Sequence, residues 1–274
     1  MPAVRQSAIL AELIGTAVMI FVGLSAIALN FGRGSPMLAW VPDAHLRLLF
    51  TACCFAGGGT AVVYSHLGVR SGGHLNPATT WAFWLMGKIP SLDALGYVLA
   101  QVIGALMGAG LVRALWGSLA ISTRLGLTQP ATGISVPMAF GLEMAMTAVM
   151  LAVVLMMVGF PRVARYTGLG VGGVMVALVY WGAPYTGTSV NPARSLAPAV
   201  WMKVFQYLGL YITAPICGAT LSAVAVRSLA SPRHYLDSCG KLFHPSQSAC
   251  HLCRLRGSHA SENRPDNGQS RGML

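Results

Sequence analysis

Charged side chains are scarce in this sequence. Only 9% of its 274 residues are charged, whereas a typical soluble domain carries about 25%. So few charges cannot cover the surface of a soluble protein of this size, which excludes an ordinary cytosolic enzyme. Acidic residues number seven, and only Glu12 and Glu143 lie inside long apolar segments. A carboxylate-rich hydrolase or a dinucleotide-binding enzyme would need polar residues that this chain does not have.

The net charge of +11 does not indicate a nucleic-acid partner. Seven of the eighteen Lys and Arg residues lie between positions 227 and 271, and no basic face runs through the rest of the chain. Basic residues at the ends of membrane spans explain the remainder more simply.

Long apolar runs dominate the sequence. A helix needs about 20 consecutive apolar residues to cross a bilayer, and six segments of about that length occur, at 8–30, 46–65, 95–116, 134–160, 166–181 and 204–226. An even number of spans puts both termini on one side of the membrane. Eight basic residues fall on that side and five on the other, which favours cytoplasmic termini in an inner or plasma membrane.

Two further apolar stretches are too short to span. They cover residues 76–86 and 191–202, and each begins with Asn-Pro; proline is favoured at the first turn of a helix. The sequence therefore predicts an all-α membrane protein with six transmembrane helices and two re-entrant half-helices.

Two motifs recur in the same order along the chain. The pattern E-x-x-x-T-A-V-M begins at Glu12 and again at Glu143, and Asn-Pro-Ala begins at Asn76 and again at Asn191. This indicates duplication of one unit, with repeats at about 5–117 and 134–230 inside one membrane domain of residues 1–230. Each unit contains three spans, an odd number, so the second copy enters the membrane from the opposite face as an inverted repeat.

These motifs resemble those of the aquaporin, or major intrinsic protein, family across residues 5–230. Segments 71–80 and 187–195 are similar to the two re-entrant loops of that family, and Tyr211-Ile212 with segment 195–199 is similar to its nodulin-26-like branch. The resemblance implies a pore in each monomer, four monomers in a homotetramer, and passive flow of water and small uncharged solutes. It implies neither catalysis nor a cofactor in the pore.

Membrane-depth backbone that is not helical must be buried or must line water. We therefore expect a ladder of carbonyl acceptors in the two loops, from Gly72, Gly73, His74, Leu75, Gly187, Ser189 and Val190. The half-helices begin at Asn76-Pro77-Ala78 and Asn191-Pro192-Ala193. Each helix start carries about half a positive charge, which in aquaporins contributes to the exclusion of cations and protons.

The resemblance also places a selectivity filter at Ala56, Val179, Thr188 and Arg194. Water-selective members carry a bulky aromatic residue and a histidine at the first two positions, so Ala56 and Val179 predict a wider filter. Such a filter favours glycerol, urea, or metalloid acids such as boric and arsenous acid. A slip of one position would put Phe55 in the lumen and would instead predict a water-selective channel.

A carboxylate inside a membrane has a high free-energy cost, so such residues are candidates for a functional role. Glu12 and Glu143 are interpreted as braces that accept N–H groups of the re-entrant loops. The alternative is an ion-coupled secondary transporter in which these two carboxylates carry the coupling ion.

The tail at 231–274 differs in composition, because Ser, Pro, His and Arg replace aliphatic residues. Three cysteines and a histidine can form a zinc site, which predicts a candidate site at Cys239, His244, Cys250 and Cys253. Unligated thiols in a disordered tail are the alternative, with disorder expected from residue 260 onward. An intramembrane metalloenzyme is disfavoured, because these residues lie outside the spans. Cys53, Cys54 and Cys217 are expected to be small core residues.

Overall fold

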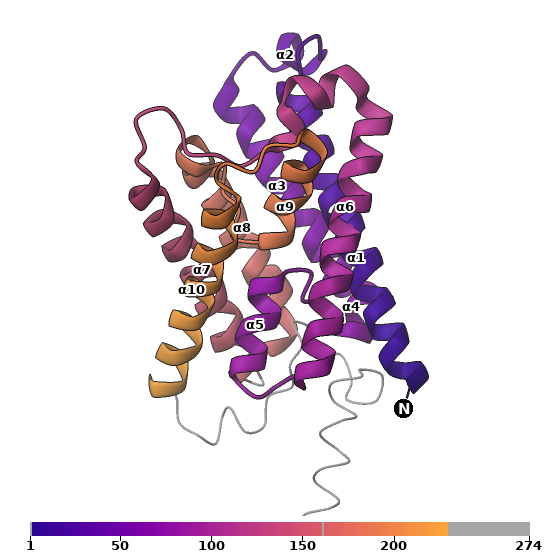
Figure 1. Ribbon diagram of the computed structural model, residues 1–274, viewed down its shortest axis with the longest axis vertical. Coiled ribbons are helices and arrows are strands. Elements are labelled where there is room, and N and C mark those ends of the chain that lie inside the picture. The colour runs from indigo at the N-terminus through magenta and orange to yellow at the C-terminus, as the bar shows by residue number, and fades with distance from the viewer. Residues whose placement is uncertain (1, 161, 230–274) are drawn as a thin grey trace, which may run out of the picture.

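A computed structural model describes residues 2–160 and 162–229 of the chain. Every regular element within those residues is helical. Six helices are long and apolar enough to cross a membrane: α1 (Pro2–Phe31), α3 (Ala44–Tyr64), α6 (Ser91–Ser122), α7 (Val136–Gly159), α8 (Thr167–Thr186) and α10 (Leu208–Leu229). The half-helices α5 (Pro77–Leu85) and α9 (Pro192–Met202) lie in the middle of the bundle, one below the other (Figure 1).

The connections contain short helices that the sequence did not predict. These are α2 (Met37–Trp40), α4 (His66–Ser71) and two 3-10 turns, η1 (Arg124–Gly126) and η2 (Ala164–Tyr166). The third span is longer than its predicted 95–116, because the helix continues through a kink at Gly117, where φ is 44°. Glycine tolerates this positive φ, so the backbone bends without interrupting the apolar run.

A local cap explains where α3 begins. The Asp43 side chain accepts the N–H groups of Leu46 and His45, and these two hydrogen bonds lower the pKa of the Asp43 carboxyl. An N-cap of this kind satisfies donors that have no partner inside the helix.

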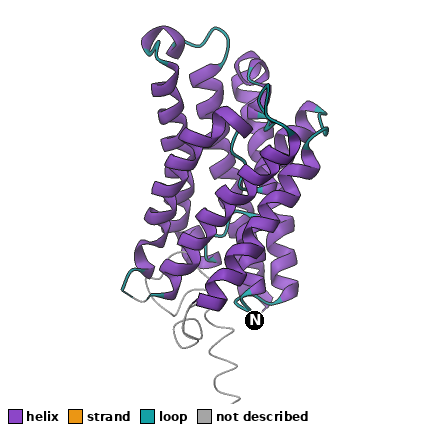
Figure 2. Ribbon diagram, turned by 90° about the vertical axis from the view of Figure 1, so that its left-hand side faces the viewer, coloured by secondary structure: helices purple, strands orange, loops and turns teal. Residues whose placement is uncertain are grey.

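In each half of the bundle, a glycine lets two long helices pack in backbone contact. A Cβ at Gly104 of α6 would lie 2.2 Å from the Leu13 carbonyl oxygen of α1, and one at Gly218 of α10 would lie 2.3 Å from the Met144 carbonyl oxygen of α7. Glycine therefore permits backbone contact in both pairs. Figure 2 shows the long helices running side by side, with loop segments reaching the interior at mid-height.

The three described cysteines correct one expectation. Cys53, Cys54 and Cys217 are exposed on the outside of the bundle and not in the core. The physical reason is that lipid accepts apolar side chains as readily as a core does, so apolarity alone does not predict burial. None of the three is among the residues that line the central cavity within the described chain.

Candidate pore and its constriction

The two Asn-Pro-Ala segments meet in the centre of the bundle. The Asn76 side chain accepts the Ala78 N–H (2.8 Å) and caps α5, and Asn191 accepts the Ala193 N–H (3.0 Å) and caps α9. Each asparagine also donates across to the other loop: Asn76 Nδ2 to the Val190 carbonyl at 2.9 Å, and Asn191 Nδ2 to the Leu75 carbonyl at 3.1 Å. The half-helices are therefore locked start to start by a reciprocal pair of hydrogen bonds.

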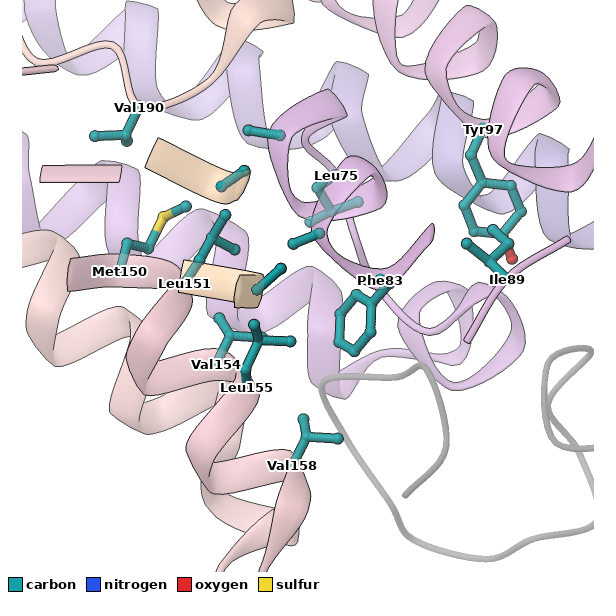
Figure 3. Packing of buried hydrophobic residues seen from close by; sticks show 14 of the residues in the cluster. Leu75, Phe83, Ile89, Tyr97, Met150, Leu151, Val154, Leu155, Val158 and Val190 are labelled. Atoms are coloured by element: carbon teal, nitrogen blue, oxygen red, sulfur yellow. The ribbon is translucent and has the colours of Figure 1, made fainter. Parts of the chain in front are cut away.

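The residue before each asparagine has a strained backbone. Leu75 has φ of 53° and Val190 has φ of 46°, and a non-glycine residue held there costs about 1–3 kcal/mol. Their side chains are buried in one apolar cluster with Met150 and Leu151 (Figure 3). Packing, together with hydrogen bonds at both the N–H and the carbonyl, holds this geometry.

Glu12 supplies the N–H acceptors for the first loop. Its carboxylate accepts the Ser71 hydroxyl (2.7 Å) and the N–H groups of His74 (2.9 Å) and Leu75 (2.8 Å). The side-chain amide of Gln101 on α6 adds a fourth bond at 2.7 Å. These bonds fill the acceptor positions of a fully buried carboxylate.

Glu143 does the same for the second loop. It accepts the Thr186 hydroxyl (2.6 Å), the Ser189 N–H (2.9 Å) and the Val190 N–H (2.9 Å). Both carboxylates are 0% exposed, and neither is among the residues lining the cavity in the described chain. This geometry is that of a brace and leaves neither carboxylate facing the solute path.

A central cavity of about 260 Å³ passes beside the two asparagines. Most of the predicted loop positions line it, namely Gly73, His74, Leu75, Ser189 and Val190. Gly72 and Gly187 do not, although both were predicted to supply carbonyls. They end α4 and α8 in the left-handed conformation, so their role is to turn the chain into each loop.

The side chain of His74 turns into the protein. Its ring stacks on Phe83 with centroids 4.8 Å apart, and Nδ1 lies 3.1 Å from the Thr80 hydroxyl. His74 is only 3% exposed. The histidine side chain therefore supports the first loop through these two contacts.

The four predicted filter residues line the same cavity. Ala56, Val179, Thr188 and Arg194 converge on it from α3, α8, the second loop and α9. The Arg194 guanidinium donates to the Gly126 carbonyl at 2.7 Å. Arg194 is thus fixed by η1, a segment that carried no recognisable sequence signal.

Phe55 also lines the cavity, beside Ala56. Its ring lies 5.4 Å from the Arg194 guanidinium carbon and packs toward α1, where a Cβ at Gly23 would lie 2.2 Å from it. The sequence predicted either Ala56 or Phe55 in the lumen, and both residues line the cavity. The sequence feature that could have settled the direction of Phe55 is Gly23 of α1, because the absence of a side chain there leaves room for the phenyl ring against α1.

The comparisons with known proteins match this architecture. The family described as Major intrinsic protein matches residues 3–226. The chain belongs to the major intrinsic protein family. It is 33% identical over 227 residues to glycerol uptake facilitator protein-like 6 of Lactiplantibacillus plantarum, covering 81% of this chain and 97% of that protein. It is 30% identical over 218 residues to nodulin-26 of Glycine max, covering 78% of this chain and 74% of nodulin-26.

A solved structure agrees on the fold. The aquaglyceroporin of Plasmodium falciparum superposes with a TM-score of 0.69 at 20% identity, covering 85% of this chain and 99% of that one. As a member of the major intrinsic protein family, this multi-pass membrane protein is a passive channel for water and small neutral solutes and not an enzyme. The predicted zinc ligands, Cys239, His244, Cys250 and Cys253, lie outside the described residues.

Proposed function

We propose that Ala56, Val179, Thr188 and Arg194, with Phe55 as an additional wall, form a wide filter. This filter passes glycerol, urea and metalloid acids such as boric and arsenous acid, together with water. The observation that carries the proposal is the pair Ala56 and Val179, two small apolar side chains that both face the cavity.

The polar groups of the path suit neutral hydroxylated solutes. An asparagine side-chain amide has two N–H donors. Each of the two asparagines uses one of these donors in the reciprocal hydrogen bonds between the loops. The second N–H of Asn76 and of Asn191 remains for a solute, since both residues line the cavity. A hydroxylated solute can exchange water hydrogen bonds for these groups, whereas an ion loses hydration that they do not replace.

Positive charge along the path supports exclusion of cations and protons. The starts of α5 and α9 meet at mid-membrane, and each carries about half a positive charge. Arg194 adds a full charge at the filter. The transporter alternative needs a carboxylate that can bind the coupling ion, and Glu12 and Glu143 are both occupied by their loops.

A water-selective channel is the second candidate, and Phe55 favours it. Its ring narrows the lumen if it turns away from Gly23 toward Val179. Stopped-flow swelling of proteoliposomes with water, glycerol, urea and boric acid, run side by side, distinguishes the two. We expect all four to cross; passage of water alone would contradict the wide filter and leave the fold intact.

We expect the assembly and the membrane placement of this chain to follow those of its family. We expect a homotetramer in the inner or plasma membrane with both termini cytoplasmic, and cross-linking with protease accessibility of the tail in sealed vesicles tests both points. Zinc in the tail is tested by metal analysis of the full chain beside a chain ending at Ala230. Zinc in both samples, or in neither, contradicts the tail site.

A further inference from the structure

A groove with two cations lies at the end of the bundle opposite the amino terminus. It is lined by Leu106 and Arg113 of α6, by Val200 and Trp201 of α9, and by Lys203, which follows α9. The two helices lie side by side at this end (Figure 1). Arg113 and Lys203 are exposed, and the groove has a volume of about 550 Å³.

The groove is a built feature with fixed walls. Trp201 Nε1 donates to the Leu106 carbonyl at 2.9 Å, and Arg113 donates to the Trp201 carbonyl at 3.0 Å. The Arg113 guanidinium carbon lies 5.6 Å from the centre of the Trp201 ring. A Cβ at Gly110 would lie 2.7 Å from that ring, so the absence of a side chain at Gly110 leaves room for the indole against α6.

No carboxylate of the protein is available to balance these two cations among the described residues. That part of the chain contains four: Glu12 and Glu143 brace the loops, Asp43 caps α3, and Asp93 pairs with Arg5 at 2.5 Å. Within residues 2–160 and 162–229, the positive charge of the groove therefore has no free carboxylate as a counterpart.

The depth of the groove places it at a membrane surface. α6 begins at Ser91, and Arg113 lies about 33 Å further along this helix at about 1.5 Å per residue. The hydrocarbon core of a bilayer is about 30 Å thick, so a helix that enters the core near Ser91 leaves it near Arg113. Tryptophan is enriched at this boundary. Two cations at headgroup level above an apolar floor match the phosphate and the acyl chain of a lipid.

We propose that this groove binds an anionic phospholipid. Its phosphate lies between Arg113 and Lys203, and an acyl chain runs along Leu106 and Val200 beside the Trp201 indole. Each cation near a membrane surface strengthens anionic lipid binding about fivefold, so the pair predicts about a twenty-five-fold preference over a zwitterionic lipid.

Brominated lipids test the proposal, because bromine quenches tryptophan fluorescence on contact. The full chain is reconstituted with brominated phosphatidylglycerol or brominated phosphatidylcholine, and subtracting the Trp201→Phe protein isolates the Trp201 signal. We expect phosphatidylglycerol to quench Trp201 at about twenty-five-fold lower mole fraction than phosphatidylcholine. Equal quenching by the two lipids would overturn the proposal.

Charge variants locate the effect. Lys203→Gln removes one charge and keeps the C-cap of α9, because Lys203 makes that cap through its backbone N–H. This variant should reduce the preference for the anionic lipid about fivefold, and adding Arg113→Gln should remove the preference. Arg33→Gln, an exposed cation at the same end, is the matched control and should change nothing. Preference retained in the double variant, or full displacement of the lipid by inorganic phosphate, would overturn the lipid assignment.

Discussion

The two re-entrant loops share their scaffold and differ in what they present to the solute. Each has a buried glutamate, a strained residue before the asparagine, and a tyrosine that donates to the start of the loop: Tyr97 to the Ser71 carbonyl at 2.6 Å and Tyr211 to the Thr186 carbonyl at 2.7 Å. Three residues after the asparagine, however, the first loop has Thr79 and the second has Arg194. The scaffold is duplicated, and the selective charge belongs to one half alone.

The bracing differs too. Gln101 lies four residues after Tyr97 and donates to Glu12, whereas the position four residues after Tyr211 is Pro215, which has no side-chain donor. Gln101 Oε1 has no hydrogen-bond partner among the described residues. The glutamate of the first loop thus has a neighbour, Gln101, whose side-chain amide can turn and change its hydrogen bonds, and the glutamate of the second loop does not. The two glutamates should therefore respond differently to the same substitution.

The largest expected effect is loss of a brace. Glu143→Gln should destabilise the protein by about 3 kcal/mol, because an amide donor would then face a buried backbone N–H. Glu12→Gln should cost about 1 kcal/mol less, because Gln101 can turn its free oxygen toward the new amide. Thermal unfolding of the purified variants measures both. An equal loss in the two would contradict the role assigned to Gln101.

The next largest effect concerns the width of the filter at Ala56. Ala56→Phe should reduce passage of glycerol and boric acid by about tenfold, equivalent to about 1.4 kcal/mol, and that of water less, because a ring then occupies the lumen. Stopped-flow swelling of proteoliposomes measures each solute. Thr79→Ala, in the first re-entrant loop, is the control. If water and glycerol fall equally, the substitution has caused misfolding, and the filter position is not supported.

The tyrosines should show that the scaffold is shared. Tyr97→Phe and Tyr211→Phe each remove one buried hydrogen bond, worth about 1 kcal/mol. We expect equal losses in thermal stability and unchanged solute preference. A change of solute preference in only one of them would show that this tyrosine belongs to the filter.

The smallest effect concerns Gly23. Gly23→Ala should push the Phe55 ring toward the lumen, at a cost of about 1 kcal/mol for overpacking, and should lower glycerol flux a few-fold. Gly141→Ala is the control, because a Cβ there meets nothing within 4 Å. Unchanged glycerol flux in Gly23→Ala would show that Phe55 does not control the width.

The fold and the two loop motifs were predictable, because membrane spans follow from apolar length and the half-helices from paired Asn-Pro starts. The contacts of Arg194 were not. The Gly126 carbonyl that fixes it belongs to a connection in which Arg124, Leu125 and Gly126 all have positive φ. Neither hydrophobic periodicity nor motif spacing indicates such a turn. Phe55 was ambiguous for a similar reason, since its direction depends on the space left by Gly23 on another helix.

The most direct test of the charge asymmetry is proton flux through proteoliposomes that contain a pH-sensitive dye. A unit charge at about 4 Å in an effective dielectric of about 20 repels a cation by about 4 kcal/mol. Arg194→Ala should therefore raise proton leak at least about tenfold, while Thr79→Ala and the unmodified protein stay tight. A tight Arg194→Ala channel that still passes glycerol, or an equal leak in Thr79→Ala, would contradict the assignment of the selective charge to the second half alone.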